Sequence, residues 1–324
     1  MSLDEMCSEI LVIRLGAMGD ILHTLPAVAS LRNSFPRQKI SWAVAPRWLP
    51  LLHGNPNIDT LLPFQRRPTA EFLRSLRSFR TVRPHLAIDF QGLVQSALLG
   101  RASRPRVYWG WDRSVVRESV AALVYTHVHV PHAIHAVEKS LELAQAAGAT
   151  SVVREFFIPP GKAEGTLPDA PFVLTNPFAG WTSKQWPLEN LELLAKKLKS
   201  VGLKLVANMP PGKAESVLLP SVVKHVSSLN GLIDATRKAV AVIGVDSGPL
   251  HLAAALSKPG VGLYGPTDPA INGPYGSSVR VLRTSTAATS YKRGNRVHAS
   301  MRTITVDQVF EALMVALEAG ERNA

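Results

Sequence analysis

Cysteine is almost absent from this sequence, since Cys7 is the single one in 324 residues. A lone cysteine excludes a disulfide framework and a cysteine-based metal site, and it is typical of proteins in a reducing compartment. Other metal and nucleotide motifs are missing too: there is no H-E-x-x-H, no D-x-D pair and no P-loop. We therefore expect neither a bound metal nor another cofactor, and no ATP hydrolysis.

Long apolar runs are also missing. No stretch reaches the ~20 uninterrupted apolar residues that a membrane-spanning helix needs. The first residues, Met1 to Glu5, are acidic and lack the basic start and apolar run of a signal peptide. We therefore expect a cytoplasmic protein that is not integral to a membrane.

Aromatic residues make up only 6% of the chain, whereas basic residues are abundant and give a net charge of +12. This charge predicts an acidic partner, and the low aromatic content argues against nucleic acid and in favour of anionic lipid or a phosphorylated substrate. Between Gln65 and Arg117 there are eleven arginines and no lysine. Arginine binds phosphate and carboxylate through paired hydrogen bonds, so two or three of these are candidates for binding anionic groups. We expect the others to form a solvated surface.

The apolar pattern alternates between strand-like and helical segments in two series. In the first series we expect strands at 10–13, 41–44 and 86–89, and helices ending near residue 31 and spanning 71–79 and 133–148. In the second we expect strands at 172–175, 203–207, 241–245 and 260–264, and helices at 188–201, 214–219, 250–256 and 306–319. A stretch rich in proline and glycine, residues 159–171, separates the two series and is the expected linker.

This alternation predicts an α/β protein with two Rossmann-like domains, 1–160 and 161–324, that face each other across a cleft. The final helix, 306–319, is amphipathic and is a candidate for packing back on the first domain. In parallel sheets of this kind ligands bind beyond the carboxyl ends of the strands. The loops that follow the strands are therefore the candidates for function.

The first such loop contains Gly16 and Gly19 and leads to Asp20 at the start of a helix. Glycine allows a tight turn and a close approach of a ligand. Asp20 is either a first-turn acid of the helix or a general base, and its spacing alone favours the helix-capping role. This loop after the first strand does not have the G-x-G-x-x-G fingerprint, which argues against a nicotinamide-dependent oxidoreductase.

A second loop, Gly244 to His251, joins an apolar strand to an apolar helix. The backbone N–H groups and dipole of a helix start form an anion site that fits a diphosphate. Ser247 can donate a hydrogen bond, Gly248 permits close approach, and His251 on the first turn can offer a proton or a positive charge. A serine-capped helix with a packed histidine is the alternative, and this pattern favours the functional interpretation.

Two further candidates lie elsewhere in the second half. Lys184 precedes the helix at 188–201 and can interact with a nucleotide phosphate, while Trp186 and Pro187 fix the entry of that helix. Glu215 follows a proline- and glycine-rich turn and can accept hydrogen bonds from ribose hydroxyls. Without a metal, the charge of a departing diphosphate would be neutralised by Lys184, His251 and the helix start.

Several of these stretches together resemble the bacterial lipopolysaccharide heptosyltransferase family, and the similarity extends over most of the chain. Three of them occur in the family's order and spacing: Val12–Pro26, Asp246–Leu252 and Tyr264–Pro269. Two more, Ile88–Ala97 and the region from Gly110 to Glu138, are most similar to the heptosyltransferase I branch.

The resemblance implies a GT-B fold and an inverting, metal-independent transfer of heptose from ADP-heptose to a Kdo hydroxyl of Kdo-lipid A. The first domain would bind the acceptor, and the second would bind the nucleotide sugar. Asp20 matches the family's catalytic base, which outweighs its interpretation as a helix cap. The other matching positions fall into two groups: donor-binding Lys184, Glu215, Asp246, Ser247, Gly248 and His251, and acceptor-binding Arg66, Arg67, Arg117 and His135.

One segment departs from the family. Where heptosyltransferase I often has hydroxyl side chains, this chain has Ala179, Gly180 and Trp181 before Thr182. Donor contacts there would come from Thr182 or from backbone N–H groups. Two alternatives stay open: a related lipopolysaccharide glycosyltransferase similar to heptosyltransferase II, and a non-catalytic sugar-nucleotide-binding protein. An acceptor anchored in lipid also implies peripheral contact with the inner face of the inner membrane.

Overall fold

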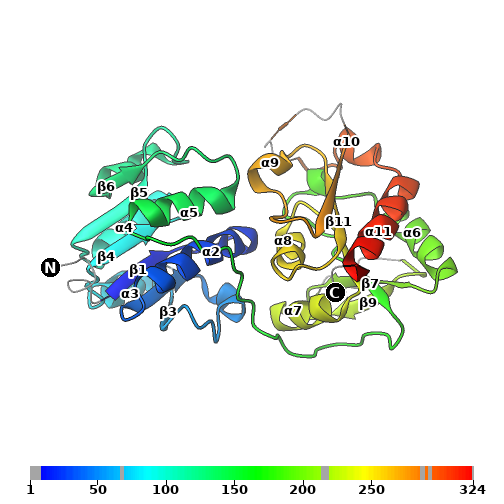
Figure 1. The fold of residues 1–324 in the computed structure, drawn as a ribbon, viewed down its shortest axis with the longest axis horizontal. Coiled ribbons are helices and arrows are strands. Elements are labelled where there is room, and N and C mark those ends of the chain that lie inside the picture. The colour runs from blue at the N-terminus through cyan, green and yellow to red at the C-terminus, as the bar shows by residue number, and fades with distance from the viewer. Residues whose placement is uncertain (1–8, 66–68, 213–218, 285–288, 291–293, 323–324) are drawn as a thin grey trace. The chain divides into compact units, whose positions relative to one another are not determined.

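The computed structural model describes residues 9–65, 69–212, 219–284, 289–290 and 294–322. The chain divides into two compact units, Met1–Pro159 and Pro160–Ala324, with a boundary one residue from the expected one. Each unit contains a parallel sheet with helices, so the predicted α/β class is confirmed (Figure 1).

The first unit begins with a buried apolar strand, as the run of aliphatic residues predicts. Its elements are β1 (Glu9–Ile13), α2 (Met18–Ser34), β2 (Lys39–Val44), η1 (Pro46–Leu51), β3 (Thr60–Pro63), α3 (Thr69–Phe79), β4 (Leu86–Asp89), α4 (Val94–Ala102), β5 (Val107–Trp111), η2 (Ser119–Val124), β6 (His127–His129) and α5 (Ala136–Ala146). The described strands pair in parallel in the order β3-β2-β1-β4-β5-β6. Helices α2 and α5 pack together, whereas α4 packs with α3 and η2.

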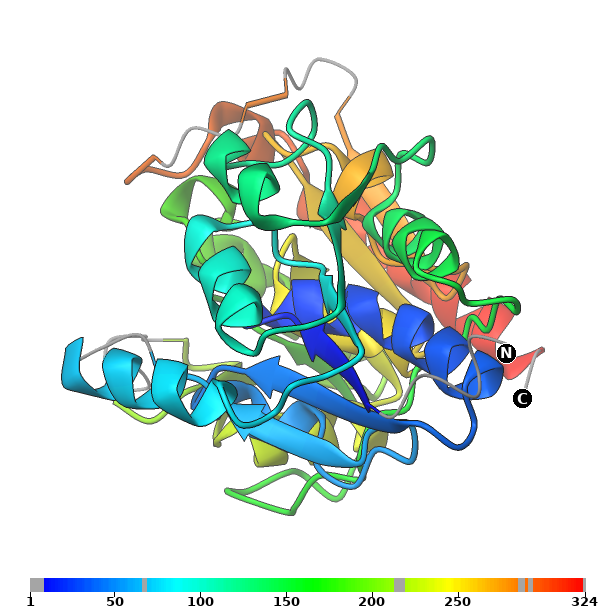
Figure 2. The same cartoon turned by 90° about the vertical axis from the view of Figure 1, so that its left-hand side faces the viewer.

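Alternate residues of β1 account for these two helical layers, because successive side chains of a strand point to opposite faces. Leu11 and Ile13 belong to a core cluster that also receives Phe72 and Leu76 from α3. The view in Figure 2 shows α2, in blue, and α3 and α4, in cyan, on different sides of β1.

The second unit repeats this plan. Its elements are β7 (Phe172–Thr175), η3 (Thr182–Lys184), α6 (Leu188–Ser200), β8 (Lys204–Met209), β9 (Val223–Val226), α7 (Leu229–Lys238), β10 (Ala241–Val245), α8 (Gly248–Ala255), β11 (Gly260–Tyr264), α9 (Pro269–Asn272), β12 (Val279–Arg283), α10 (Ala299–Arg302) and α11 (Val306–Glu321). The described strands follow the order β12-β11-β10-β7-β8-β9, all in parallel. The helix expected at 214–219 lies almost entirely outside the described residues.

Both sheets reverse their strand order next to the first strand of the unit. The reversal falls between β1 and β4 in the first unit and between β7 and β10 in the second. Loops at the carboxyl ends of two such strands diverge to opposite faces of the sheet and leave a crevice where ligands bind. The sequence-predicted loops at Asp20 and at Asp246 follow β1 and β10, so each begins at one of these crevices.

Helix α11 belongs to the second unit. Its residues Val309 and Leu313 are fully buried in the core of the second unit, together with residues of β10 and β11. The apolar face of this helix therefore packs on the core of its own unit. Among the helices that the structure describes, none is long and apolar enough to span a membrane.

Candidate active site

Asp20 lies in the first turn of α2, just beyond the carboxyl end of β1. One carboxylate oxygen accepts a hydrogen bond from the Ala17 N–H at 3.0 Å, and the other lies 2.9 Å from a guanidinium nitrogen of Arg14. The side chain nevertheless keeps 40% of its surface exposed. Asp20 therefore caps the start of the helix and also presents an oriented carboxylate to solvent, so the two interpretations of this residue are compatible.

The loop that carries Asp20 is tied to the turn after β4. The side-chain oxygen of Gln91 accepts hydrogen bonds from the Leu15 and Gly16 N–H groups, at 3.1 and 3.3 Å. Arg14 also donates to the Phe90 carbonyl, so the cation that orients Asp20 is itself held by the neighbouring strand end. These contacts join the loop after β1 to the turn after β4, across the strand-order reversal.

Asp89, the last residue of β4, is the buried anchor of that turn. It is fully buried, and its carboxylate accepts hydrogen bonds from the Gln91 and Gly92 N–H groups and from the hydroxyls of Ser96 and Tyr125. Burial raises the pKa of Asp89, and the four hydrogen bonds offset part of that rise. Asp89 and Gln91 are functional residues that the sequence motifs do not predict, although an acid that ends a buried apolar strand is a recognisable signal.

His135, the predicted acceptor-binding histidine, lies next to α2. It caps the start of α5, where its Nδ1 accepts a hydrogen bond from the Val137 N–H at 3.2 Å. Its ring lies edge-on to that of His23, with 5.5 Å between centroids, and His23 is one helical turn beyond Asp20. Arg117 is exposed between β5 and η2. The predicted residues Arg66 and Arg67 lie outside the described residues.

In the second unit, Lys184, Asp246 and His251 come together from three elements. The Lys184 Nζ lies 2.5 Å from one oxygen of Asp246, and the His251 Nε2 lies 3.6 Å from the other. The Lys184 Nζ also lies 4.4 Å from the centre of the Trp181 ring, at the position where this chain departs from the family pattern. The three predicted donor-binding side chains thus form one charged group at the carboxyl ends of β7 and β10.

The charge of Asp246 is stabilised by its partners. Burial alone would raise its pKa, but the imidazole of His251 and the ammonium of Lys184 outweigh burial and lower the pKa of Asp246 well below its ordinary value. Asp246 is therefore an anion that holds Lys184 in place. An acid at this position cannot itself bind a diphosphate, whereas the lysine that it orients can.

The loop that is expected to form an anion site ends at the start of α8. Ser247 precedes the first helical residue, Gly248, but its side chain makes no capping hydrogen bond. Its Oγ has no hydrogen-bond partner among the described residues. A purely capping role therefore does not account for Ser247. Thr182 begins the short η3 turn that ends at Lys184, and Glu215 lies outside the described residues.

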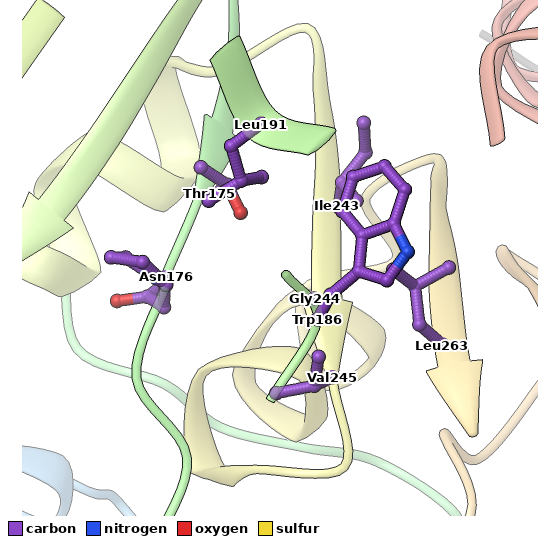
Figure 3. Close-up of a pocket in the computed structure, with 9 residues that line it drawn as sticks. Thr175, Asn176, Trp186, Leu191, Ile243, Gly244, Val245 and Leu263 are labelled. Carbon is purple, nitrogen blue, oxygen red and sulfur yellow. The ribbon is translucent and has the colours of Figure 1, made fainter. Parts of the chain in front are cut away.

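A small apolar recess of about 10 Å³ is lined by the last residues of β10, which directly precede Asp246 (Figure 3). Residues at the ends of β7, β10 and β11 line it together with Trp186, whose indole N–H donates to the Ile304 carbonyl at 3.0 Å. Its volume fits one water molecule at most, so it is a packing defect and no nucleotide pocket. Trp186 lies two residues before the start of α6, and its hydrogen bond to Ile304 holds that start in place, as the sequence predicts.

Within the described residues, no three His, Cys, Asp or Glu side chains gather closely enough to hold a metal ion. The polar groups at both strand-order reversals are instead one oriented acid in the first unit and a lysine, an acid and a histidine in the second. The first unit therefore provides a candidate base, and the second provides a candidate anion-binding group.

The model of glycosyltransferase family 9 (heptosyltransferase) matches residues 72–299. The chain belongs to this family. It is therefore a glycosyltransferase, and the interpretations as an oxidoreductase or a nucleic-acid-binding protein are rejected. Family membership also argues against a non-catalytic binding protein, since glycosyltransferase family 9 is a family of enzymes.

Individual relatives narrow the placement within glycosyltransferase family 9. Lipopolysaccharide heptosyltransferase 1 of Salmonella typhimurium is 29% identical over 297 residues, which is 83% of this chain and 92% of that protein. The Escherichia coli heptosyltransferase WaaC, solved with ADP, is 25% identical with a TM-score of 0.75, covering 98% of this chain and 100% of the other. E. coli ADP-heptose lipopolysaccharide heptosyltransferase II has a TM-score of 0.79 at 23% identity over 97% and 99% of the chains.

These comparisons confirm the GT-B fold and the resemblance on which the sequence analysis relied. Within family 9 the chain is most like heptosyltransferase 1, and its activity is heptose transfer in lipopolysaccharide core synthesis.

Proposed function

We propose that this glycosyltransferase transfers heptose from ADP-heptose to a Kdo hydroxyl of Kdo-lipid A, with inversion at the anomeric carbon and without a metal. The acceptor is anchored in lipid, so the reaction takes place at the cytoplasmic face of the inner membrane. The observation that carries the proposal is the half-exposed carboxylate of Asp20, oriented by Arg14 and by the Ala17 N–H.

Asp20 acts as the general base. The acceptor hydroxyl donates its proton to the exposed carboxylate as its oxygen attacks the anomeric carbon, and the ADP leaving group departs from the opposite side. A single displacement of this kind inverts the anomeric centre. Arg14 and Gln91 hold the loop that carries the base, so that its carboxylate is oriented before the substrates bind.

The group around Lys184 binds the donor. Its ammonium and the start of α8, at Ser247 and Gly248, stabilise the negative charge that develops on the departing diphosphate. His251 supports the charge of Asp246 and completes the group. The similarity to a heptosyltransferase solved with ADP supports this assignment. Of the remaining predicted positions, Thr182 and Glu215 would contact the donor, and Arg66, Arg67, Arg117 and His135 the anionic acceptor.

The test is ADP release from ADP-heptose with and without deacylated Kdo-lipid A. We expect Asp20→Ala to lower kcat by ~10²–10⁴ while ADP affinity stays nearly unchanged. Asp307→Ala is the matched control, because Asp307 is also a first-turn acid of its helix but lies in α11. A parallel loss of ADP affinity in Asp20→Ala would show that Asp20 binds the donor or supports the fold, and would contradict its role as the base.

The acceptor separates this proposal from the heptosyltransferase II alternative. Offering the native protein Kdo-lipid A and, separately, an acceptor that already carries one heptose distinguishes the two. ADP release only with the second acceptor would favour the alternative. ADP release with neither acceptor, despite binding of ADP-heptose, would require a different acceptor.

A further inference from the structure

Large apolar side chains are exposed on three neighbouring elements of the first unit. Leu73 of α3 is 50% exposed, Leu98 of α4 is 46% exposed, and Val120 and Leu123 of η2 are 60% and 79% exposed. Helix α4 packs against both α3 and η2, so the three elements form one layer. We call the outer surface of this layer, formed by the exposed residues of these elements, the α3–α4–η2 face (Figure 2). Clustered exposed apolar residues of this kind mark interaction sites.

The exposed leucine of α3 is not a displaced core residue. Phe72, Leu76 and Phe79 of the same helix already pack into the core of the unit. Leu73 therefore lies outside a complete apolar stripe. In α4 the arrangement is the same: Leu99 is fully buried, whereas Leu98 is exposed.

The exposed leucines of α3 and α4 each have an arginine one helical turn further along. Leu73 is followed four residues later by Arg77, and Leu98 three residues later by Arg101, and both arginines are exposed. Residues at these spacings are neighbours on a helix surface. Among α3, α4 and η2 the sequence has one acid, Glu71, which is paired with Arg74. The α3–α4–η2 face is therefore both apolar and positively charged.

We infer that the α3–α4–η2 face docks on an anionic phospholipid bilayer. Arginine guanidinium groups bind lipid phosphates in the headgroup layer, while the leucines and valine enter the boundary with the acyl chains. An apolar side chain beside each cation is the arrangement that such a surface needs, because either component alone gives weak attachment. A soluble acidic partner would require the charge but not the four exposed apolar side chains.

The location of this face agrees with its use in the proposed reaction, on which this part of the inference rests. Helix α4 begins at Val94, directly after the Gln91 turn that holds the loop of Asp20. The Glu118 carboxylate, next to η2, accepts a hydrogen bond from the Val94 N–H at 2.7 Å. The docked face therefore adjoins the sheet edge that carries the base, and an acceptor can stay in the bilayer while its sugar reaches Asp20.

Vesicle co-sedimentation of the full chain tests the inference without requiring activity. The native protein should bind vesicles of phosphatidylcholine mixed with phosphatidylglycerol, and bind vesicles of phosphatidylcholine alone much more weakly. Replacing Arg77 and Arg101 by glutamine should weaken binding about fivefold for each arginine. The pair Leu98→Ser and Leu123→Ser should weaken it by about tenfold for each leucine.

Matched controls come from exposed residues of the second unit. Leu193→Ser in α6 and Arg280→Gln in β12 remove an exposed leucine and an exposed arginine, and both should leave vesicle binding unchanged. On the deacylated acceptor in solution, the face variants should keep the native kcat/KM, whereas on acceptor embedded in vesicles they should lose activity in proportion to binding. Vesicle binding by a protein that transfers no heptose would refute the proposed function and leave the docking inference standing.

Three results would overturn the inference. One is equal binding of native protein and face variants to anionic vesicles, and another is an equal loss in the control variants. The third is an absence of vesicle binding combined with a dimer that Leu123→Ser dissociates, which would assign the face to a second copy of the chain. Capture of an oligonucleotide in place of vesicles would likewise count against a bilayer.

Discussion

Replacing Lys184 by methionine separates two roles of the same side chain. Lys184 is only 16% exposed and its partner Asp246 only 10% exposed, so the substitution leaves a buried carboxylate with His251 alone. Removing one partner of a buried ion pair costs about 3–5 kcal/mol, and the remaining solvent contact favours the lower end. For a unit of this size, about 3 kcal/mol corresponds to a fall in Tm of roughly 6–12 °C.

The same substitution removes the proposed diphosphate ligand. A hydrogen bond between charged groups contributes about 1.5–3 kcal/mol, so ADP affinity should fall about 10–150-fold. The double variant Lys184→Met, Asp246→Asn removes the buried charge as well. It should regain most of the lost Tm, because replacing both members of a buried pair is often nearly neutral. It should not regain ADP affinity.

Calorimetric unfolding and titration with ADP measure the two effects on the same samples. Lys197→Met is the control, since Lys197 is 45% exposed and pairs with the exposed Asp307. A surface pair of this kind contributes about 0–1 kcal/mol, so neither Tm nor ADP affinity should change much. Recovery of ADP affinity together with Tm in the double variant would refute the reasoning, because Lys184 would then act on the nucleotide only through the fold.

Three further predictions concern stability. The pKa of Asp246 is lower in the folded than in the unfolded state, so ionised Asp246 stabilises the fold fully at pH values above its unfolded pKa of about 4, and this stabilisation is lost as the pH falls below that value. Asp246→Asn should therefore make the urea midpoint depend less on pH below about 4. Asp89→Ala should cost about 3–5 kcal/mol in urea unfolding, because four buried donors lose their acceptor, whereas the isosteric Asp89→Asn should cost much less; equal costs would contradict the network. The Oγ1 of Thr305 accepts a hydrogen bond from the Gln308 N–H and caps the start of α11, so Thr305→Ala should lower the free energy of unfolding by about 1 kcal/mol. An unchanged Tm in thermal unfolding would refute the capping role.

The strands that the sequence predicted are those buried on both faces. The segments at 86–89, 172–175, 241–245 and 260–264 form strands over the expected residues, since continuous apolar runs are typical of central parallel strands. The strands that were missed include the outer pair β9 and β12, which contain the exposed Lys224 and Arg280 among their few residues. Outer strands bury less surface, so their sequences tolerate charged residues and lack the continuous apolar run that marks a central strand.

The site was predicted in part for a similar reason. Asp20, Lys184 and Asp246 occur in recognisable loops next to glycine or proline. Gln91 accepts hydrogen bonds from Leu15 and Gly16, 76 and 75 positions away, across the strand-order reversal, and Asp89 accepts one from Tyr125, 36 positions away. Contacts at that separation depend on which strands become neighbours, and single-sequence patterns do not specify strand order.

The burial of α11 has a consequence for the order in which the chain acquires its structure during synthesis. The first unit is one continuous segment whose core is complete when residue 159 has been made, so it can fold while the rest is still being translated. The second unit has no such advantage, because Val309 and Leu313 fill its core from the far end of the chain. A ribosome that stalls before Val306 would therefore release a folded first half joined to a second half with an open core, and that half is the part exposed to proteases and aggregation.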